Sequence, residues 1–220
     1  MIIDGRKMRS LNQGYCRLVA KYKQGKSDFY WDENLDRVQA KHNNQKRDLI
    51  NKTARFIVNY CLNHDLGNIV FGWNGDLKQS SQMSKQNNQS FVMIPTKRLI
   101  DRVIQLASEY GIKVTVTEEA YTSKASFLDG DELYPHGEKP KEVKFSGKRV
   151  KRGLYRTLSG CIVNADCNGA ANILKKVATQ LGITLTKVGR GALTLPNRYD
   201  LFTCLSKSYR KKALLTIASA

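Results

Sequence analysis

An aspartate, Asp166, stands where a short apolar segment gives way to a helix of small residues. The apolar segment, residues 161–163, has the composition of a strand. The residues after Asp166 place apolar side chains at spacings of three and four, which predicts a helix that Gly182 is suited to end. A carboxylate at the start of a helix can bind a divalent cation such as Mg²⁺, which prefers oxygen ligands. It can equally cap the helix, since aspartate is a preferred N-cap residue. Spacing alone leaves both interpretations open.

The elements that must position Asp166 alternate between helices and strands. In chain order the predicted elements are a helix at 11–22, a long helix at 35–63, a strand at 68–72, a helix from Pro95 to Gly111, and a strand at 112–117. Helix and strand in alternation predict an α/β sheet rather than a helical bundle.

Several stretches have weaker patterns. The middle of the long helix, residues 41–47, is wholly polar and is expected to cross solvent or lie against a charged partner, with His42 solvated. Residues 74–90 have the composition of a mobile loop. Residues 189–196 are typical of a loop or an edge strand. The basic cluster at 207–212 is expected to be a frayed tail, with a phosphate contact as the alternative.

The composition points to a polyanionic partner. Thirty-seven Lys and Arg residues against nineteen Asp and Glu residues give the 220-residue chain a net charge of +18, which favours nucleic acid over an acidic membrane. The five cysteines form no Cys-x-x-Cys pair, so we expect reduced thiols and no zinc ribbon. Without a long apolar run or a secretion signal, we expect a cytoplasmic, nucleoid-associated protein with no membrane partner.

Three stretches together resemble one family. Residues 166–173 have the pattern Asp-x-Asn-x-x-Ala-Asn-Ile, residues 119–124 have Glu-x-Tyr-Thr-Ser-Lys, and residues 2–13 form the third stretch. They resemble, in the same order, segments of the TnpB (OrfB) proteins of insertion sequences. Those proteins are related to the type V CRISPR effectors and cut DNA under RNA guidance. The resemblance covers roughly residues 1–180, and three matches in register are more specific than one.

The resemblance implies an RNase H-like, RuvC-type mixed sheet with flanking helices, of which the first strand or strands are missing. Residues 1–181 would form this incomplete nuclease domain, and residues 182–220 a C-terminal tail. Residues 137–156 would be a basic insert, a loop or hairpin independent of metal, where many relatives carry a four-cysteine zinc ribbon.

The resemblance also implies a catalytic site that uses Mg²⁺ or Mn²⁺. A two-metal nuclease needs carboxylates that converge on two ions roughly 4 Å apart. Asp166 would be one ligand. Strand alternation places Glu118 and Glu119 on opposite faces, and we favour Glu119 as the second ligand, with Glu118 as the alternative and a solvated strand end as the alternative for both. The strand at 69–73 carries no acid, and the acid that follows it is Asp76.

The first catalytic motif of the family, an aspartate at the end of the opening strand, is expected just upstream of this chain. Asp4 imitates it but is assigned to a turn, because residues 6–13 match the segment that follows the motif. Without that aspartate a two-ion site is not expected to form. A coding sequence upstream of Met1 or a separate polypeptide would have to supply it.

Residues predicted to contact nucleic acid lie in two groups. Tyr121, Thr122, Ser123 and Lys124 would position a strand near the site. Between Lys139 and Arg156, eight Lys and Arg residues accompany a single acid. The predicted phosphate contacts in that interval are Lys148, Arg149, Lys151, Arg152 and Arg156, with a solvated basic loop as the alternative.

Two functions are therefore expected, from different classes. The first is the C-terminal part of a TnpB-like RNA-guided DNA endonuclease, with target DNA and a guide RNA as partners and cleavage only in its complete form. The second is an inactive remnant or regulator that binds nucleic acid without cutting it.

Overall fold

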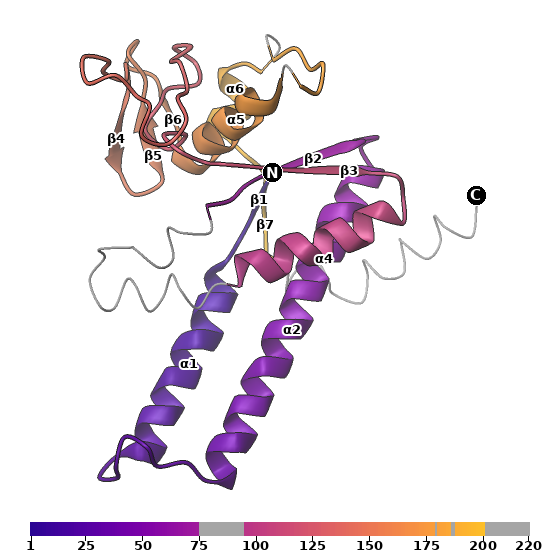
Figure 1. The fold of residues 1–220 in the computed structure, drawn as a ribbon, viewed down its shortest axis with the longest axis vertical. Helices are drawn as coiled ribbons and strands as arrows, with labels where there is room; N and C mark the ends of the chain where they lie inside the picture. The colour runs from indigo at the N-terminus through magenta and orange to yellow at the C-terminus, as the bar shows by residue number, and fades with distance from the viewer. Residues whose placement is uncertain (75–94, 179, 186–187, 201–220) are drawn as a thin grey trace. The chain divides into compact units, whose positions relative to one another are not determined.

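The computed structural model describes residues 1–74, 95–178, 180–185 and 188–200 (Figure 1). The chain combines helices with short strands, as the sequence predicts, although two helices follow one another between residues 6 and 62 and four strands follow one another between residues 113 and 164. The chain divides into two compact units. Unit 1 comprises residues 1–2, 68–77 and 114–198, and unit 2 comprises residues 3–67, 78–113 and 199–220. Within the described ranges the strands form three small sheets, not the single mixed sheet that was expected.

Unit 2 is built on three helices. In Figure 1, α1 (Arg6–Lys23) and α2 (Glu33–Leu62) form a long hairpin, and α4 (Thr96–Ser108) packs on α2. Asp32 caps α2, since its Oδ1 accepts the N–H of Leu35 at 2.9 Å. One core cluster consists of Met8, Leu49, Ile50 and Phe56.

The long helix was predicted well, but the prediction of a solvated His42 is wrong. His42 is only 6% exposed, and its ring stacks on Tyr15 of α1 with centroids 4.1 Å apart. Its Nε2 lies 3.0 Å from Oδ1 of Asn12, and Nε2 carries the proton because an amide oxygen only accepts. His42 therefore has partners within the chain, because α1 folds back against α2, whereas most of residues 41–47 are exposed, as expected.

Burial of His42 makes the stability of the protein depend on pH. Desolvation lowers the pKa of His42, and Lys46 lowers it further. The unfolded chain takes up a proton first as the pH falls, so the free energy of unfolding is fully present above the ordinary histidine pKa and declines below it. We expect urea unfolding to show this loss between about pH 7 and pH 5, at no more than about 1.4 kcal/mol per pH unit.

The matched variant for this measurement is His42→Gln, which keeps a polar side chain but does not titrate. Its stability is expected to vary less over the same pH range than that of the wild type. Identical pH profiles for the two proteins would show that His42 does not contribute to the dependence.

Strands β2 (Asn68–Gly72) and β3 (Lys113–Thr117) confirm the strands predicted on either side of the third helix. They run in the same direction. The N–H of Lys113 donates to the carbonyl of Gly67 at one end, and the N–H of Trp73 donates to the carbonyl of Thr117 at the other. A short strand β1 (Ile2–Ile3) pairs with β7 (Arg198–Tyr199).

Unit 1 contains an antiparallel sheet of β4 (Lys148–Lys151), β5 (Leu154–Arg156) and β6 (Ile162–Asn164), together with the helices α5 (Ala165–Ala178) and α6 (Arg190–Thr194) (Figure 1). The interval 137–156 thus contains the predicted hairpin. One core cluster of unit 1 consists of Tyr155, Val163, Ala165 and Leu193.

Residues 189–196 were predicted as loop or edge structure, and this is wrong for residues 190–194. They form α6, whose Leu193 is buried among the core side chains, and this burial outweighs the weak local pattern. The expected loop at 75–90 and the basic cluster at 207–212 lie outside the described residues. Among the described helices, none combines the length and apolar character that crossing a membrane requires.

Candidate functional site

Asp166 lies in the first turn of α5, but it does not cap the helix. Asn164, the last residue of β6, is the cap, because its Oδ1 accepts the N–H groups of Asp166 at 2.9 Å and of Cys167 at 3.1 Å. The Asp166 side chain is 72% exposed, and its Oδ1 lies 4.0 Å from Nη2 of Arg149 on β4. An exposed pair at this distance is weak, so the carboxylate remains available to a ligand.

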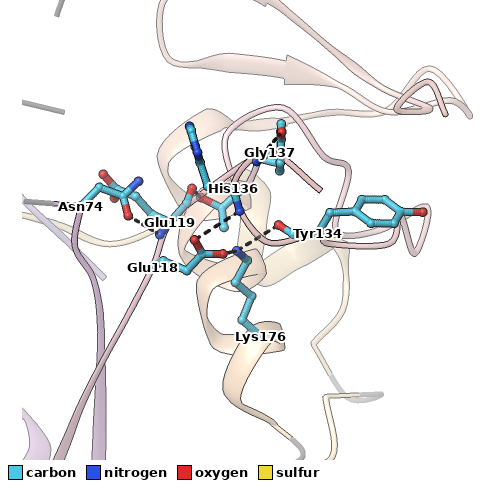
Figure 2. A network of polar contacts seen from close by, with 9 residues as sticks. Asn74, Glu118, Glu119, Tyr134, His136, Gly137 and Lys176 are labelled. Carbon is cyan, nitrogen blue, oxygen red and sulfur yellow. Dashed lines mark hydrogen bonds and ion pairs between the residues drawn. The ribbon is translucent and has the colours of Figure 1, made fainter. Parts of the chain in front are cut away.

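Glu118, just after β3, forms an ion pair with Lys176 near the C-terminal end of α5. Its Oε1 lies 2.7 Å from Nζ of Lys176, and its Oε2 accepts the N–H of His136 at 3.4 Å (Figure 2). The hydrogen bond from Lys176 is the main reason that the pKa of Glu118 is lowered. Lys176 also reaches the carbonyl of Tyr134. Glu118 therefore helps to hold the loop around residue 136 on α5, and serving as a metal ligand would require it to leave Lys176.

Glu119 points away from that ion pair. Its N–H donates to Oδ1 of Asn74 at 3.1 Å (Figure 2), and its carboxylate has no hydrogen-bond or ion-pair partner among the residues the structure describes. Its Cβ packs beside Gly72 of β2, where an added Cβ would lie 3.1 Å from Glu119 Cβ and 2.6 Å from Ile173 Cδ1. Only glycine at position 72 allows this approach of the strand to α5.

Ile173 and Asp166 are seven residues apart on α5, which places them on one face of the helix about two turns, or about 10 Å, apart. Glu119, which packs near Ile173, therefore lies along the helix face that begins with Asp166. Glu118 does not, because Lys176 holds it. The choice of Glu119 as the second ligand stays a prediction, but this geometry favours it.

Within residues 1–74, 95–178, 180–185 and 188–200 no group of three or more His, Cys, Asp and Glu side chains is arranged to hold a metal ion. Asp4 belongs to a turn, as expected: its carboxylate accepts the N–H of Arg6 and pairs with the Arg6 guanidinium. Asp76 lies outside the described residues. The described acids therefore do not complete a two-ion site on their own.

Two buried asparagines that the sequence analysis did not single out connect the two resembling motifs. The side chain of Asn168 donates to the carbonyl of Ala125 at 2.8 Å and accepts the N–H of Phe127 at 3.0 Å. Asn172 donates to the carbonyls of Thr122 and Ala125. Both asparagines are fully buried. Two amide side chains four residues apart on the inward face of a helix could have been recognised in the sequence. Because buried amide groups nearly always have hydrogen-bond partners, this spacing would have predicted that both side chains bind another segment.

The segment 121–124 divides into residues that hold the turn and residues that face solvent. Tyr121 has a φ of 62°, and its hydroxyl accepts the N–H of Gly137 at 3.3 Å. Thr122 is buried, and its hydroxyl donates to the carbonyl of Glu119 at 2.9 Å. Ser123 and Lys124 are exposed. The latter two are therefore available for the predicted phosphate contacts, whereas Tyr121 and Thr122 shape the turn.

The predicted basic contacts lie on the β4–β5 hairpin. Lys148 lies directly opposite Arg156, and Arg149 lies opposite Tyr155. Tyr155 is buried, its hydroxyl donates to the carbonyl of Lys124, and burial raises its pKa to about 12. Because like charges in directly opposed positions destabilise a sheet, the pair of Lys148 and Arg156 favours a bound polyanion. Lys151 and Arg152 are also exposed.

Two carboxylates accept hydrogen bonds from residues on either side of this hairpin. Asp131 accepts the N–H of Ser126 at 2.7 Å and the hydroxyl of Ser146 at 2.6 Å. Asp129 accepts the N–H of Leu158 at 2.8 Å. These bonds connect both ends of the hairpin to the segment that follows Lys124, through two carboxylates that accept main-chain N–H groups and a serine hydroxyl.

The comparisons with known proteins give a likeness in fold. No family model matches the sequence, and no curated protein matches it significantly. The structure is similar to Cas12f1 in the cryo-EM structure of the Cas12f1–sgRNA–target DNA complex, with a TM-score of 0.51 and 17% sequence identity. The similarity covers 77% of this chain and 42% of the Cas12f1 chain, so this chain spans less than half the length of the protein it matches. The chain therefore has a mixed α/β fold, with helices and small sheets, that is similar to the fold of Cas12f1.

Proposed function

We propose that this chain is the C-terminal part of a TnpB-like, RNA-guided DNA endonuclease with a RuvC-type, RNase H-like nuclease domain. One observation carries the proposal. Asn172 of the stretch 166–173 donates to the carbonyl of Thr122 in the stretch 119–124, and Asn168 and Asn172 both donate to Ala125, the residue that follows it. Residues 43 to 50 positions apart thus form one structural unit, which chance matches to two motifs would not require. The likeness to Cas12f1 supports the proposal.

In this function Asp166 and Glu119 would bind Mg²⁺ or Mn²⁺, and the ions would activate water and stabilise the leaving oxygen. The described acids of this chain are too few for that site. Cleavage therefore needs a carboxylate beyond the described acids, and in this proposal the aspartate of the family's first motif would supply it. The chain's own contribution would be to present Asp166 on the capped end of α5, clear of structural bonds.

The proposed partners are target DNA and a guide RNA, and the proposed location is the cytoplasm, in association with the nucleoid. The β4–β5 hairpin would bind phosphates through its exposed cations. The alternative function, binding without cleavage, is favoured by the lack of a three-acid group among the described residues. Binding is common to both functions and is tested first.

Replacing Arg156 with glutamine is expected to weaken nucleic-acid binding while leaving the free protein as stable as before, or slightly more so. Each lost phosphate contact lowers the slope of log affinity against log salt by about 0.9 for duplex DNA. In the free protein, Lys148 and Arg156 repel each other across the sheet, and such a pair destabilises a sheet by about 0.2–1 kcal/mol. The substitution removes this repulsion. Fluorescence anisotropy with labelled duplex at several salt concentrations measures the slope, and thermal unfolding measures stability.

Lys52→Gln is the matched control, because Lys52 is an exposed cation paired with Asp48 on α2. Its salt slope is expected to equal that of the wild type. If Arg156→Gln leaves the slope unchanged as well, the hairpin is not a phosphate contact.

A further inference from the structure

The turn that joins α1 to α2, residues 24–32, presents aromatic rings to solvent. We call it the aromatic turn. Phe29 is 96% exposed and Trp31 is 43% exposed. Large apolar side chains at this exposure are typical of a surface that a partner covers.

The rings are held in place although they are not covered. The N–H of Tyr30 donates to the carbonyl of Ser27 at 3.0 Å, and its hydroxyl donates to Oδ2 of Asp32 at 2.8 Å. The indole N–H of Trp31 donates to Oδ1 of Asp36 at 2.7 Å. The turn is therefore ordered by its own hydrogen bonds, and Phe29 is exposed on an organised support, which reduces the entropy lost when a partner binds.

Cations surround the rings. Nζ of Lys26 lies 3.7 Å from the centre of the Tyr30 ring, and Nζ of Lys23 lies 5.5 Å from the Trp31 ring. Helix α1, which leads into the turn, carries six Lys and Arg residues and no acid. Its exposed Arg17 and Lys21 are four residues apart, on one face.

Most nearby acids are already engaged. Asp32 caps α2, Asp36 binds the indole of Trp31, and Glu33 pairs with Arg37. Asp28 adds one negative charge within the turn. A hydrogen bond from a neutral donor leaves a carboxylate charged, so residues 17–37 carry five cations and four acids, and the excess of positive charge lies on α1. The turn therefore places aromatic faces beside the cations of α1, a combination used in single-stranded nucleic-acid binding.

We infer that the aromatic turn is a second nucleic-acid contact, at which an unpaired base stacks on Phe29 and the adjoining phosphates bind Lys21 and Lys26. The inference rests on the proposed function, since it requires a chain that binds nucleic acid. Nucleic acid fits better than a protein partner because lysines lie over two of the three rings, whereas the core of a protein interface is depleted in lysine.

The test uses the full chain and a fluorescein-labelled oligothymidylate of about 20 nucleotides, longer than the about 4–16 nucleotides that one single-strand binding module covers. Phe29→Ala is expected to weaken binding by about five- to a hundredfold, the loss of one stacked base. Phe29→Trp is expected to restore it. Leu195→Ala, which removes an equally exposed apolar side chain (88%) in unit 1, is expected to have no effect.

A strand of the same length without bases separates stacking from charge. On that strand, Phe29→Ala is expected to bind as the wild type does. An equal loss on both strands, or wild-type affinity of Phe29→Ala for oligothymidylate, would overturn the inference and leave the proposed function standing. Failure of the wild type to bind any DNA or RNA would overturn both.

Discussion

Replacing Asp166 with alanine is expected to abolish RNA-guided DNA cleavage, with a rate loss of about 10³-fold or more, because members of a catalytic unit act together. The assay is single-turnover cleavage of labelled target DNA in Mg²⁺, with the cognate RNA and with the polypeptide that carries the first-motif aspartate. The Asp166 side chain is 72% exposed, and Asn164 rather than Asp166 caps the helix. The free energy of unfolding of the variant is therefore expected to differ from that of the wild type by no more than about 0.5 kcal/mol. Loss of activity would then report on chemistry rather than on folding.

The two glutamates supply the matched comparison for this experiment. Glu119→Gln is expected to lower the cleavage rate strongly, because the Glu119 carboxylate has no structural partner among the described residues and packs along the Asp166 face of α5. Glu118→Gln is expected to keep most of the activity, because Glu118 is bound by Lys176. Equal cleavage by the wild type and Asp166→Ala would remove Asp166 from the mechanism. The reverse order of the two glutamate variants would make Glu118 the ligand.

Asn168→Ala is expected to lower the free energy of unfolding by about 2–4 kcal/mol, a large part of the stability of an ordinary domain. The substitution leaves the N–H of Phe127 without its side-chain acceptor, and the carbonyl of Ala125 keeps only the side-chain bond from Asn172. Each buried group left unsatisfied costs about 1–3 kcal/mol. Urea unfolding followed by far-UV circular dichroism measures the change.

Asn51→Ala is the control for that substitution, because Asn51 is exposed on α2. Its stability is expected to differ from the wild type by no more than about 0.5 kcal/mol. A loss below about 1 kcal/mol for Asn168→Ala would mean that water replaces the amide, and that the link between the two motifs is weaker than its geometry indicates.

Much of the fold was predictable because it depends on local periodicity. The strands at 68–72 and 113–117 and the helices at 33–62 and 96–108 are set by the spacing of apolar residues and by Pro95 and Gly111, all close together in sequence. The start of α5 was predictable for the same reason. Asp166 was a candidate because a carboxylate at the start of a helix can bind a cation, and the two glutamates were candidates because of the resemblance to the TnpB family.

The tertiary structure decided how those residues are used. Asn164, not Asp166, caps the helix, which the spacing of residues did not indicate. Glu118 forms an ion pair with a lysine 58 positions later in the chain, and the buried His42 forms a hydrogen bond with an asparagine 30 positions earlier. Such partners meet only when helices and strands pack, and neither periodicity nor residue type specifies which distant side chain will lie within about 3 Å.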